Sequence, residues 1–328
     1  MPNSFNILVT GANGQLGSEI KHLVDNSFFK MDPRVKPEDD GTVIPAFSRH
    51  SREGGNPAMH HNYHFHFATQ NDLDLSNLCK MKDFFERKKF DVIINCAAYT
   101  AVDKAESEQE LADAVNHLAV KHLAEISKEL GIRLIHISTD YVFDGKNYKP
   151  YTETDITNPQ SVYGKTKLDG ENALIAINPS HSVIIRTSWV YSSYGANFVK
   201  TMLRLGRERE SLGVIFDQAG TPTYARDLAD AILRMLSDEC LVLNENVEIY
   251  HYSNEGVCSW YDFAKAIFEF SDIKCNVKPI ETKDYPTPAR RPHYSLLNKA
   301  KIKSAFGIEI PYWRDSLEEC LKIMGEKK

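Results

Sequence analysis

The stretch FNILVTGANGQLG, residues 5–17, joins a short apolar run to the start of a helical pattern. The run has the composition of a buried strand, and residues 14–26 carry apolar side chains at helical spacing. Between the two, Gly11, Gly14 and Gly17 form a G-x-x-G-x-x-G pattern. Glycines allow a tight turn and close backbone approach, and a helix N-terminus offers free N–H groups to a pyrophosphate. A glycine turn in this position predicts a dinucleotide-binding unit, and the alternative is a tight turn without a ligand.

The alternation of strand and helix patterns continues well beyond this first unit. Further strand patterns lie at residues 63–69, 91–98, 133–139 and 182–191, with helical patterns at 76–89, 110–131 and around 161–171. Strands that alternate with helices predict parallel βαβ units, and near-continuous apolar strands fit a sheet covered on both faces. The expected fold class is α/β, a Rossmann-type doubly wound parallel sheet with a smaller mixed α/β C-terminal substrate domain.

Two domains are expected from this organisation. Residues 1–180 are expected to form a dinucleotide-binding Rossmann-type domain. Residues 181–328 are expected to be mainly the smaller substrate domain, with part of 205–250 returning to the first. In the second half, helical patterns remain at residues 197–209, 227–239 and 259–271, joined by links richer in proline and aromatic residues.

Residues 29–61 interrupt the expected first βαβ unit. They are rich in proline and glycine and have no strong apolar period, so we interpret them as an inserted, flexible surface segment. The part VIPAFSRHSREGGNP, residues 43–57, resembles translated palindromic repeats that spread through some bacterial genomes. At most a short helical turn is expected at residues 36–41, and the insertion is predicted to be functionally neutral.

Composition and charge exclude several classes of protein. A net charge of -6 and the absence of a basic run argue against nucleic-acid and anionic-membrane partners. No apolar stretch approaches the roughly 20 residues of a membrane span, and no signal peptide is apparent. The six cysteines are scattered without a C-x-x-C pair and read as reduced. We expect a cytoplasmic globular protein.

The segment SVYGKTKLDGE, residues 161–171, places Tyr163 and Lys167 four apart on an expected helix, so both point to the same side. Such a pair is often only a pair of surface neighbours. A nearby cation, however, favours the phenolate, lowers the pKa of tyrosine and makes it a usable proton donor. The motif STDYVFDG, residues 138–145, follows an apolar strand, so Thr139 is expected near Tyr163 at the carboxyl edge of the sheet. A hydroxyl, a phenol and a lysine together suit carbonyl reduction.

The chain resembles the extended short-chain dehydrogenases/reductases, and within them the dTDP-4-dehydrorhamnose reductases. The resemblance rests on TGANGQLG, NCAAYTAVDKAE, STDYVFDG, VYGKTKLDGE, RTSWVY, NFVKTML, DQAGTPT and YPTPARRPHYSLLN, which cover nearly the whole chain outside the insertion. It implies reduction of the C4 ketone of dTDP-4-dehydro-6-deoxy-L-mannose to dTDP-L-rhamnose. The implied cofactor is NADPH. NADH is expected to work too, because neither an acid nor an arginine lies at the tip of the second strand. The implied partner is a small-molecule dTDP-sugar, and a homodimer is left open.

The resemblance also implies a role for each site residue. Tyr163 protonates the C4 oxygen as the nicotinamide delivers hydride, Lys167 lowers the pKa of Tyr163 and bonds the nicotinamide ribose, and Thr139 hydrogen-bonds the same oxygen. The cofactor contacts expected besides Tyr163 and Lys167 are Gly11, Asn13, Gly14, Gln15, Leu16, Gly17, Asp74, Leu75, Ala97, Ala98 and Thr100. The substrate contacts expected are Val102, Thr139, Asp140, Trp189, Asn197 and Arg291, with the guanidinium of Arg291 on the diphosphate.

Two positions depart from the family pattern. Tyr294 stands where the family commonly has an asparagine in R-P-x-N-S. Some members bridge a dimer with Mg²⁺ through several glutamates; Glu19 matches one of these, but Arg226 occupies the place of another, so no metal is expected. The four histidines of HHNYHFH could be metal ligands, but they adjoin the insertion and alternate along a strand, so we interpret them as ordinary residues of these segments. They are His60, His61, His64 and His66.

Two other functions share parts of this sequence pattern. A nucleotide-sugar dehydratase of the same superfamily places an Asp-Glu pair after the threonine, whereas here Asp140 is followed by Tyr141. An epimerase belongs to the same group of rivals. A non-catalytic regulatory subunit that retains the fold is the second rival, and the intact trio of Thr139, Tyr163 and Lys167 argues against it.

Overall fold

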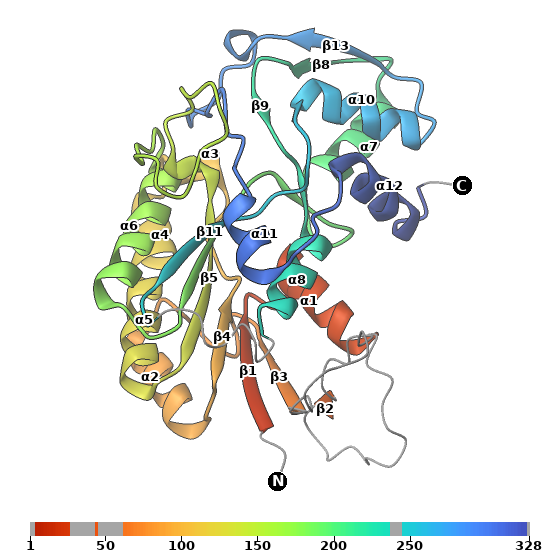
Figure 1. Cartoon of the computed structure of the whole chain (residues 1–328). Helices are drawn as coiled ribbons and strands as arrows, with labels where there is room; N and C mark the ends of the chain where they lie inside the picture. Colours follow the sequence, from red (N-terminus) through yellow and green to blue (C-terminus); the bar gives the residue numbers. More distant parts are fainter. Residues whose placement is uncertain (1–3, 27–42, 45–61, 237–244, 327–328) are drawn as a thin grey trace.

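A seven-stranded sheet forms the centre of the computed structural model, which describes residues 4–26, 43–44, 62–236 and 245–326 (Figure 1). The strand order is β11-β6-β5-β4-β1-β3-β2. These strands are β1 (Ser4–Thr10), β2 (Val43–Ile44), β3 (Asn62–Ala68), β4 (Val92–Asn95), β5 (Arg133–Thr139), β6 (Val183–Thr187) and β11 (Glu248–His251). All neighbours from β3 to β11 are parallel, and only β2 is antiparallel, at one edge. The predicted α/β class with a doubly wound parallel sheet is confirmed.

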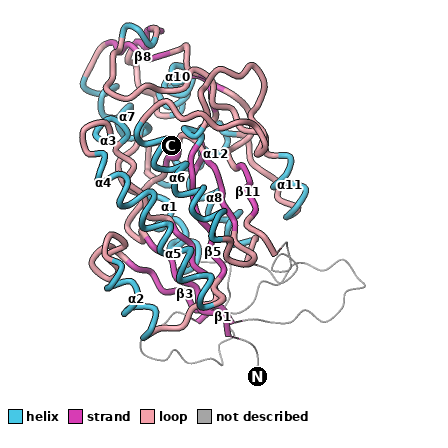
Figure 2. Tube along the Cα trace, turned by 90° about the vertical axis from the view of Figure 1, so that its left-hand side faces the viewer, coloured by secondary structure: helices cyan, strands magenta, loops and turns pink. Residues whose placement is uncertain are grey.

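Helices cover both faces of the sheet (Figures 1 and 2). One face carries α1 (Gln15–Asp25), α8 (Ala225–Arg234) and α11 (Ala300–Phe306), and the other α2 (Leu78–Arg87), α5 (Ala119–Leu130) and α6 (Val162–Ile177). Successive strand residues point to opposite faces. Ile7 and Val9 therefore pack with the first group and Leu8 with the second. Because each strand is buried on both sides, its sequence is continuously apolar.

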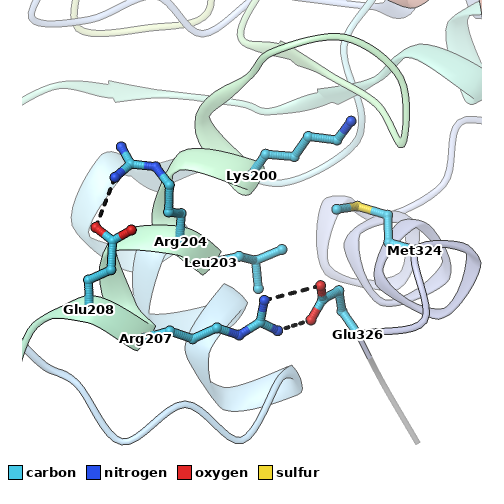
Figure 3. Close-up of a pocket in the computed structure, with 7 residues that line it drawn as sticks. All are labelled: Lys200, Leu203, Arg204, Arg207, Glu208, Met324 and Glu326. Carbon is cyan, nitrogen blue, oxygen red and sulfur yellow. Dashed lines mark hydrogen bonds and ion pairs between the residues drawn. The ribbon is translucent and has the colours of Figure 1, made fainter.

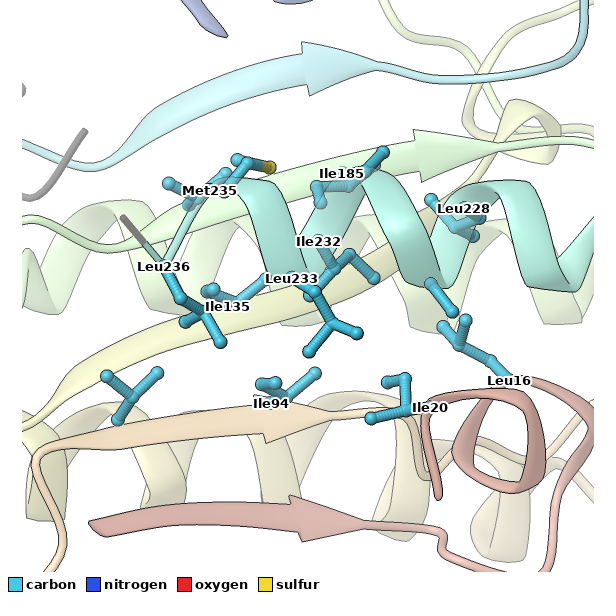
Figure 4. Packing of buried hydrophobic residues seen from close by; sticks show 14 of the residues in the cluster. Leu16, Ile20, Ile94, Ile135, Ile185, Leu228, Ile232, Leu233, Met235 and Leu236 are labelled. Carbon is cyan, nitrogen blue, oxygen red and sulfur yellow. The ribbon is translucent and has the colours of Figure 1, made fainter. Parts of the chain in front are cut away.

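The core beneath α1 and α8 is built from branched aliphatic side chains. Ile20 of α1 and Ile232 of α8 lie against Ile94 and Ile135 of the sheet (Figure 4). Each of these four side chains is fully buried. Burial of one such side chain stabilises a fold by roughly 1.5–3 kcal/mol, so this layer holds the two helices firmly on the sheet.

The helix predicted at residues 110–131 has an irregular middle. It consists of α4 (Gln109–Asp113), a π-helical turn η1 (Ala114–Leu118) and α5, and it ends at Gly131. Gly131 has φ of +69°, the left-handed conformation that closes many helices. The side chain of Asn116, in the π turn, accepts a hydrogen bond from the N–H of Tyr99 (2.9 Å) and so ties the helix to the loop after β4.

The single strand predicted at residues 182–191 is wrong. β6 remains in the sheet, but Val190–Tyr191 form a separate strand, β7, that pairs with β10 (Thr223–Tyr224). Between them Trp189 has φ of +48°, a conformation that non-glycine residues rarely adopt. This turn directs the chain out of the sheet towards the second region.

A smaller α/β region follows, with its own core. It contains α7 (Phe198–Glu208), α10 (Trp260–Phe270), α12 (Trp313–Ile323), β8 (Ser211–Ile215), β13 (Asn276–Ile280), β9 (Ala219–Gly220) and β12 (Cys258–Ser259). β13 pairs in parallel with β8, and buried aromatic and aliphatic side chains of the three helices pack together. From the same half of the chain, α8 packs on α1 and β11 joins β6 in the central sheet.

The insertion contributes one described element. Val43 and Ile44 form β2, which pairs with Tyr63 and His64 of β3, a contact that the sequence pattern did not predict. The helical turn expected at residues 36–41 and the rest of the insertion lie outside the described residues. No helix in the part of the chain that the structure describes combines the length and apolar character that a membrane crossing requires.

Candidate active site

The glycine turn after β1 has the shape required of a dinucleotide cradle. Gly11 has φ of +64°, and a Cβ at this position would lie 2.7 Å from the backbone nitrogen of Ala97. A Cβ at Gly17 would lie 2.5 Å from the carbonyl oxygen of Gly11. Only glycine fits either position, so β1, the loop after β4 and α1 meet closely here. Gly14 begins α1 without a side-chain cap, which leaves the positive end of the helix to a ligand, and the residues present fit a pyrophosphate.

The predicted adenine contacts lie just beyond β3. Asp74 accepts hydrogen bonds from the N–H (3.1 Å) and hydroxyl (2.6 Å) of Ser76, which lower its pKa, and Leu75 is buried. Sequence reasoning overlooked Asp72, whose Oδ2 accepts from the N–H (2.9 Å) and hydroxyl (2.6 Å) of Thr69. The strand tip therefore carries a carboxylate, although one that is bonded to its own turn.

Three side chains of α6 lie on the side of the helix that faces β5. Ser161 begins α6, its hydroxyl accepting a hydrogen bond from the N–H of Gly164 (3.2 Å). Tyr163, Lys167 and Glu171 then follow at intervals of four and lie on one side. The β5 residues on the same side of the sheet include His136 and Ser138, which are bonded to Lys167 and Glu171 respectively. This face of β5 and α6 is polar although it is buried.

Tyr163 and Thr139 come together as predicted from the motifs. Thr139 forms a side-chain hydrogen bond with the phenol of Tyr163, and the ring of Tyr141 packs edge-on against Tyr163 with centroids 5.5 Å apart. Burial raises the pKa of Tyr163 to about 12, against the lowering effect of the hydrogen bond with Thr139 and with a smaller raising effect from the charge of Asp140. The expected lowering of this pKa is therefore not what the geometry gives, because desolvation of the phenolate outweighs the favourable contacts.

Lys167 is buried with its ammonium facing β5. Nζ donates to the carbonyl oxygen of Ile137 (2.6 Å) and lies 3.3 Å from Nε2 of His136. Burial lowers the pKa of Lys167 to about 8, and the carboxylate of Glu171 opposes this shift. A lysine in this state changes charge close to neutral pH, which suits a residue that assists proton transfer.

A buried ion pair supports the end of β5. Glu171 accepts hydrogen bonds from Arg186 of β6 through Nε (3.1 Å) and Nη2 (2.6 Å), and both side chains are almost wholly buried. Ser138 donates its hydroxyl to the same carboxylate. Since Ser138 precedes Thr139, the pair holds the strand end that carries the predicted catalytic hydroxyl. The sequence contained one indication of the place of Glu171, since it follows Lys167 by four residues and so lies on the same side of α6.

Asp140 is a buried carboxyl group beside the trio. Oδ1 accepts from the hydroxyl of Thr139 (3.1 Å), and Oδ2 has no hydrogen-bond partner within the described residues. Burial raises the pKa of Asp140 to about 7, against the opposing effect of hydrogen bonds from Ser295 and Thr139. A carboxyl group in this position suits a polar contact to a bound sugar.

Two predicted substrate residues, Trp189 and Asn197, lie in the second region, and Asn197 is bonded to the start of α1. Trp189 stacks on Trp260 with ring centroids 3.6 Å apart. Asn197 begins α7, where its Oδ1 accepts from the N–H of Lys200 (3.1 Å), and its Nδ2 donates to Oε1 of Gln15 (3.0 Å). The helix of the second region is therefore bonded directly to a predicted cofactor residue.

Arg291 is bonded to a residue that sequence reasoning missed. Its Nη1 and Nη2 donate to the two carboxylate oxygens of Asp103 at 3.0 and 2.7 Å, and Nη1 also donates to Thr287 (2.6 Å). Asp103 lies in α3 (Val102–Ala105), beside the predicted substrate residue Val102. The pair joins the C-terminal region to the loop after β4 and fixes the direction of the guanidinium. Nothing in the sequence pattern marked Asp103 as its partner.

The remaining predicted positions have more ordinary environments. The N–H of Tyr294 donates to the carbonyl oxygen of Gly145 (3.2 Å). Burial raises the pKa of Glu19, while the hydroxyl of Ser192 and the charge of Arg226 lower it. Among the described residues no group of three or more His, Cys, Asp or Glu side chains could hold a metal. His60 and His61 lie outside them, so the absence of a metal stays a prediction.

A cavity of about 300 Å³ lies elsewhere, between α7 and the C-terminal residues (Figure 3). It contains none of the predicted site residues. Arg204 pairs with Glu208 (2.9 Å) and Arg207 with Glu326, so its charges are largely neutralised. We assign it no part in the reaction.

Comparison with known proteins gives a consistent result over the whole chain. The family model described as RmlD substrate binding domain matches residues 5–325. The dTDP-4-dehydrorhamnose reductase of Aggregatibacter actinomycetemcomitans is 40% identical over 321 residues, 95% of this chain and 97% of that protein. A solved dTDP-4-dehydrorhamnose reductase from Clostridium acetobutylicum has a TM-score of 0.82 and 38% identity, covering 98% of this chain and 100% of that one. One from Bacillus anthracis, in complex with NADP, has a TM-score of 0.81 and 33% identity, covering 98% and 99%.

Proposed function

The chain belongs to the family of dTDP-4-dehydrorhamnose reductases, NAD(P)H-dependent oxidoreductases of dTDP-rhamnose biosynthesis, and on this premise we propose how its residues act. The substrate is dTDP-4-dehydro-6-deoxy-L-mannose and the product dTDP-L-rhamnose. Two contacts at the carboxyl end of β5 support the proposal: a side-chain hydrogen bond between Thr139 and Tyr163, and the hydrogen bond from Lys167 to the carbonyl oxygen of Ile137.

Each residue of the trio has a separate task. A nicotinamide cofactor supplies hydride to C4 when bound. Tyr163 donates its phenolic proton to the C4 oxygen, so that the ketone becomes a hydroxyl with charge balanced. Thr139 orients the phenol and hydrogen-bonds the same oxygen, and Lys167 stabilises the phenolate left behind. Because burial raises the pKa of Tyr163 to about 12, the phenol is fully protonated before the reaction and needs this cation only as it loses its proton.

The proposed cofactor site consists of the glycine turn, the start of α1, the residues after β3 and the loop after β4. We assign the pyrophosphate to the start of α1, at Gly14, Gln15 and Leu16, and the adenine side to Asp74 and Leu75. Gly11, Asn13 and Gly17 shape the turn, and Ala97, Ala98 and Thr100 line the loop after β4. The absence of a Cβ at Gly11 and Gly17 supports this assignment, because a larger residue would close the turn.

Both regions supply the proposed substrate contacts. We assign Val102, Asp140, Trp189 and Asn197 to the dTDP-sugar. Arg291, whose guanidinium is held by the two oxygens of Asp103, is assigned to the diphosphate. The region after residue 180 thus serves mainly as the substrate domain, while the sheet and its helices, including α8 and β11, bind the cofactor. We further propose a cytoplasmic enzyme, and light scattering of the purified chain decides whether it is a homodimer.

Removing one hydroxyl tests the assignment of the proton donor. Tyr163→Phe keeps the ring, so folding and cofactor binding survive while kcat falls by roughly 10²–10⁴, the usual contribution of a positioned acid. Tyr141→Phe is the matched control, since it removes a phenol one ring contact away. Activity is measured with dTDP-4-dehydro-6-deoxy-L-mannose and NADPH. A Tyr163→Phe enzyme that keeps more than half of the wild-type kcat would show that Tyr163 is not the proton donor.

We propose NADPH as the preferred cofactor, supported by the NADP in the Bacillus anthracis relative, with NADH also accepted. The strand tip offers no arginine to a 2′-phosphate, and the carboxylate of Asp72 is already bonded to Thr69. Discrimination between the two should therefore stay below about 2 kcal/mol. Values of kcat/KM that differ a thousandfold would contradict this expectation.

A further inference from the structure

A line of buried polar side chains runs from the centre of the sheet to Lys167. Thr10 of β1, Asn95 of β4 and His136 of β5 are 2%, 1% and 0% exposed, and Lys167 of α6 is 2% exposed. The hydroxyl of Thr10 donates to Oδ1 of Asn95 (2.7 Å), Nδ2 of Asn95 lies 3.1 Å from Nδ1 of His136, and Nε2 of His136 lies 3.3 Å from Nζ of Lys167. Of these four residues, the proposed reaction uses only Lys167.

The orientation of Asn95 determines which nitrogen of His136 carries the proton. Oδ1 of Asn95 also accepts from the backbone N–H of Ala97 (3.3 Å), and a backbone N–H can only donate. The amide group is therefore oriented with Nδ2 towards His136, so Nδ1 of His136 must accept. A neutral imidazole that accepts at Nδ1 carries its proton on Nε2. Burial keeps His136 neutral, because it holds the pKa of this ring well below its usual value, and Lys167 lowers it further.

The Nε2–H group consequently points at Nζ of Lys167. An ammonium has no lone pair and cannot accept this hydrogen bond, whereas a neutral amine can. The carbonyl oxygen of Ile137 (2.6 Å) accepts from Nζ in either state. The carboxylate of Glu171 also interacts with Nζ and favours its ammonium form. This carboxylate is itself paired with Arg186. Tyr163 lies one turn earlier on the same side of α6.

We propose that His136, held in its Nε2–H form by Asn95, is a positioning residue that sets the pH above which Lys167 loses its proton. The inference rests on the proposed role of Lys167 in stabilising the phenolate of Tyr163. The reaction rate should therefore fall at alkaline pH as Lys167 loses its proton, since the neutral amine cannot stabilise the negative charge of the phenolate. The buried environment supports this, because burial lowers the pKa of Lys167 to about 8.

Two substitutions act on this contact by different routes. Asn95→Asp keeps the acceptor for Thr10 and Ala97 but replaces the donor Nδ2 by an oxygen, so the proton of His136 moves to Nδ1 and Nε2 becomes an acceptor for the ammonium. His136→Phe keeps a ring and removes the donor. Both changes favour the ammonium of Lys167. The alkaline limb of kcat should therefore move upward by about one pH unit in each variant.

A matched control separates this effect from simple loss of stability. His251 of β11 is equally buried, and its Nδ1 lies 3.1 Å from the carbonyl oxygen of Tyr151 rather than beside a lysine. His251→Phe should lower the melting temperature and leave the alkaline limb in place. A merely structural role for His136 would give the same result in the His136→Phe variant.

The experiment combines pH profiles of kcat at saturating substrate and NADPH with ¹⁵N NMR of the imidazole rings. We expect the Nε2–H form of His136 in the wild type, the Nδ1–H form in Asn95→Asp, and an upward-shifted limb in both variants. A wild-type ring protonated on Nδ1, or limbs that stay in place in both variants, would overturn the inference. The NMR arm needs no turnover and therefore tests the tautomer even if the proposed reaction fails, which an inactive wild type would reveal separately.

Discussion

Replacing Glu171 by glutamine tests how strongly the buried ion pair supports the active site. Glu171 is 0% exposed and Arg186 3% exposed, and three contacts of 3.1, 3.1 and 2.6 Å join them. In the Glu171→Gln variant the guanidinium stays buried while its counter-charge is lost. Nη1 of Arg186 already has no hydrogen-bond partner within the described residues, so no spare acceptor is at hand.

The expected loss follows from the burial of the pair. Removing one partner of a buried pair costs about 3–5 kcal/mol, because the remaining charge is left uncompensated. The exposed pair Arg204–Glu208, with side chains 60% and 53% exposed, is the matched control. Exposed pairs at this spacing contribute only about 0.3–0.5 kcal/mol, so Glu208→Gln should be nearly neutral.

Equilibrium unfolding in guanidinium chloride at neutral pH, followed by circular dichroism, measures both variants. The double variant Glu171→Gln/Arg186→Met should lose less than the sum of its single changes, because it leaves no isolated charge. The Glu171→Gln variant should also show a lower kcat, since Ser138, which precedes Thr139, loses its carboxylate partner. If Glu171→Gln costs no more than Glu208→Gln, the reasoning about the buried charge is wrong.

Three further predictions concern other parts of the molecule. Burial raises the pKa of Asp140 to about 7, so the folded chain binds this proton more tightly than the unfolded chain, and stability is lost as pH rises from about 4 to 7. Asp140→Asn should therefore gain melting temperature over wild type at pH 8 more than at pH 5; an equal difference at both would contradict this. Gly11→Ala should weaken NADPH binding at least about tenfold in a fluorescence titration, because its Cβ would meet the backbone of Ala97 at 2.7 Å. Gly131→Ala, with φ of +69° and nothing within 4 Å of its Cβ, should bind NADPH normally. Deleting residues 31–58 with a short Gly-Ser link should leave kcat/KM within a few-fold and stability within about 1–2 kcal/mol, since loop length costs little. Loss of activity or solubility would show that the insertion, which supplies the edge strand β2, is required by the fold or the site.

The sequence by itself determined the features that depend on near neighbours. The β1–turn–α1 unit follows from an apolar run, three glycines and a helical period that lie within about 20 residues of one another. The spacing of four placed Tyr163 and Lys167 on one side of α6, because a helix repeats every 3.6 residues. Family motifs then indicated the reaction, and the fold class and family are confirmed.

Only the tertiary structure decided what surrounds these side chains. His136 approaches Lys167 across 31 residues of chain, and Asp103 binds Arg291 across 188. The left-handed turn at Trp189 was likewise invisible in local patterns. Burial and hydrogen-bond partners arise where strands and helices from distant parts of the chain pack together. Spacing therefore predicted which side Tyr163 and Lys167 share, whereas desolvation in the packed interior determined the direction in which their pKa values move.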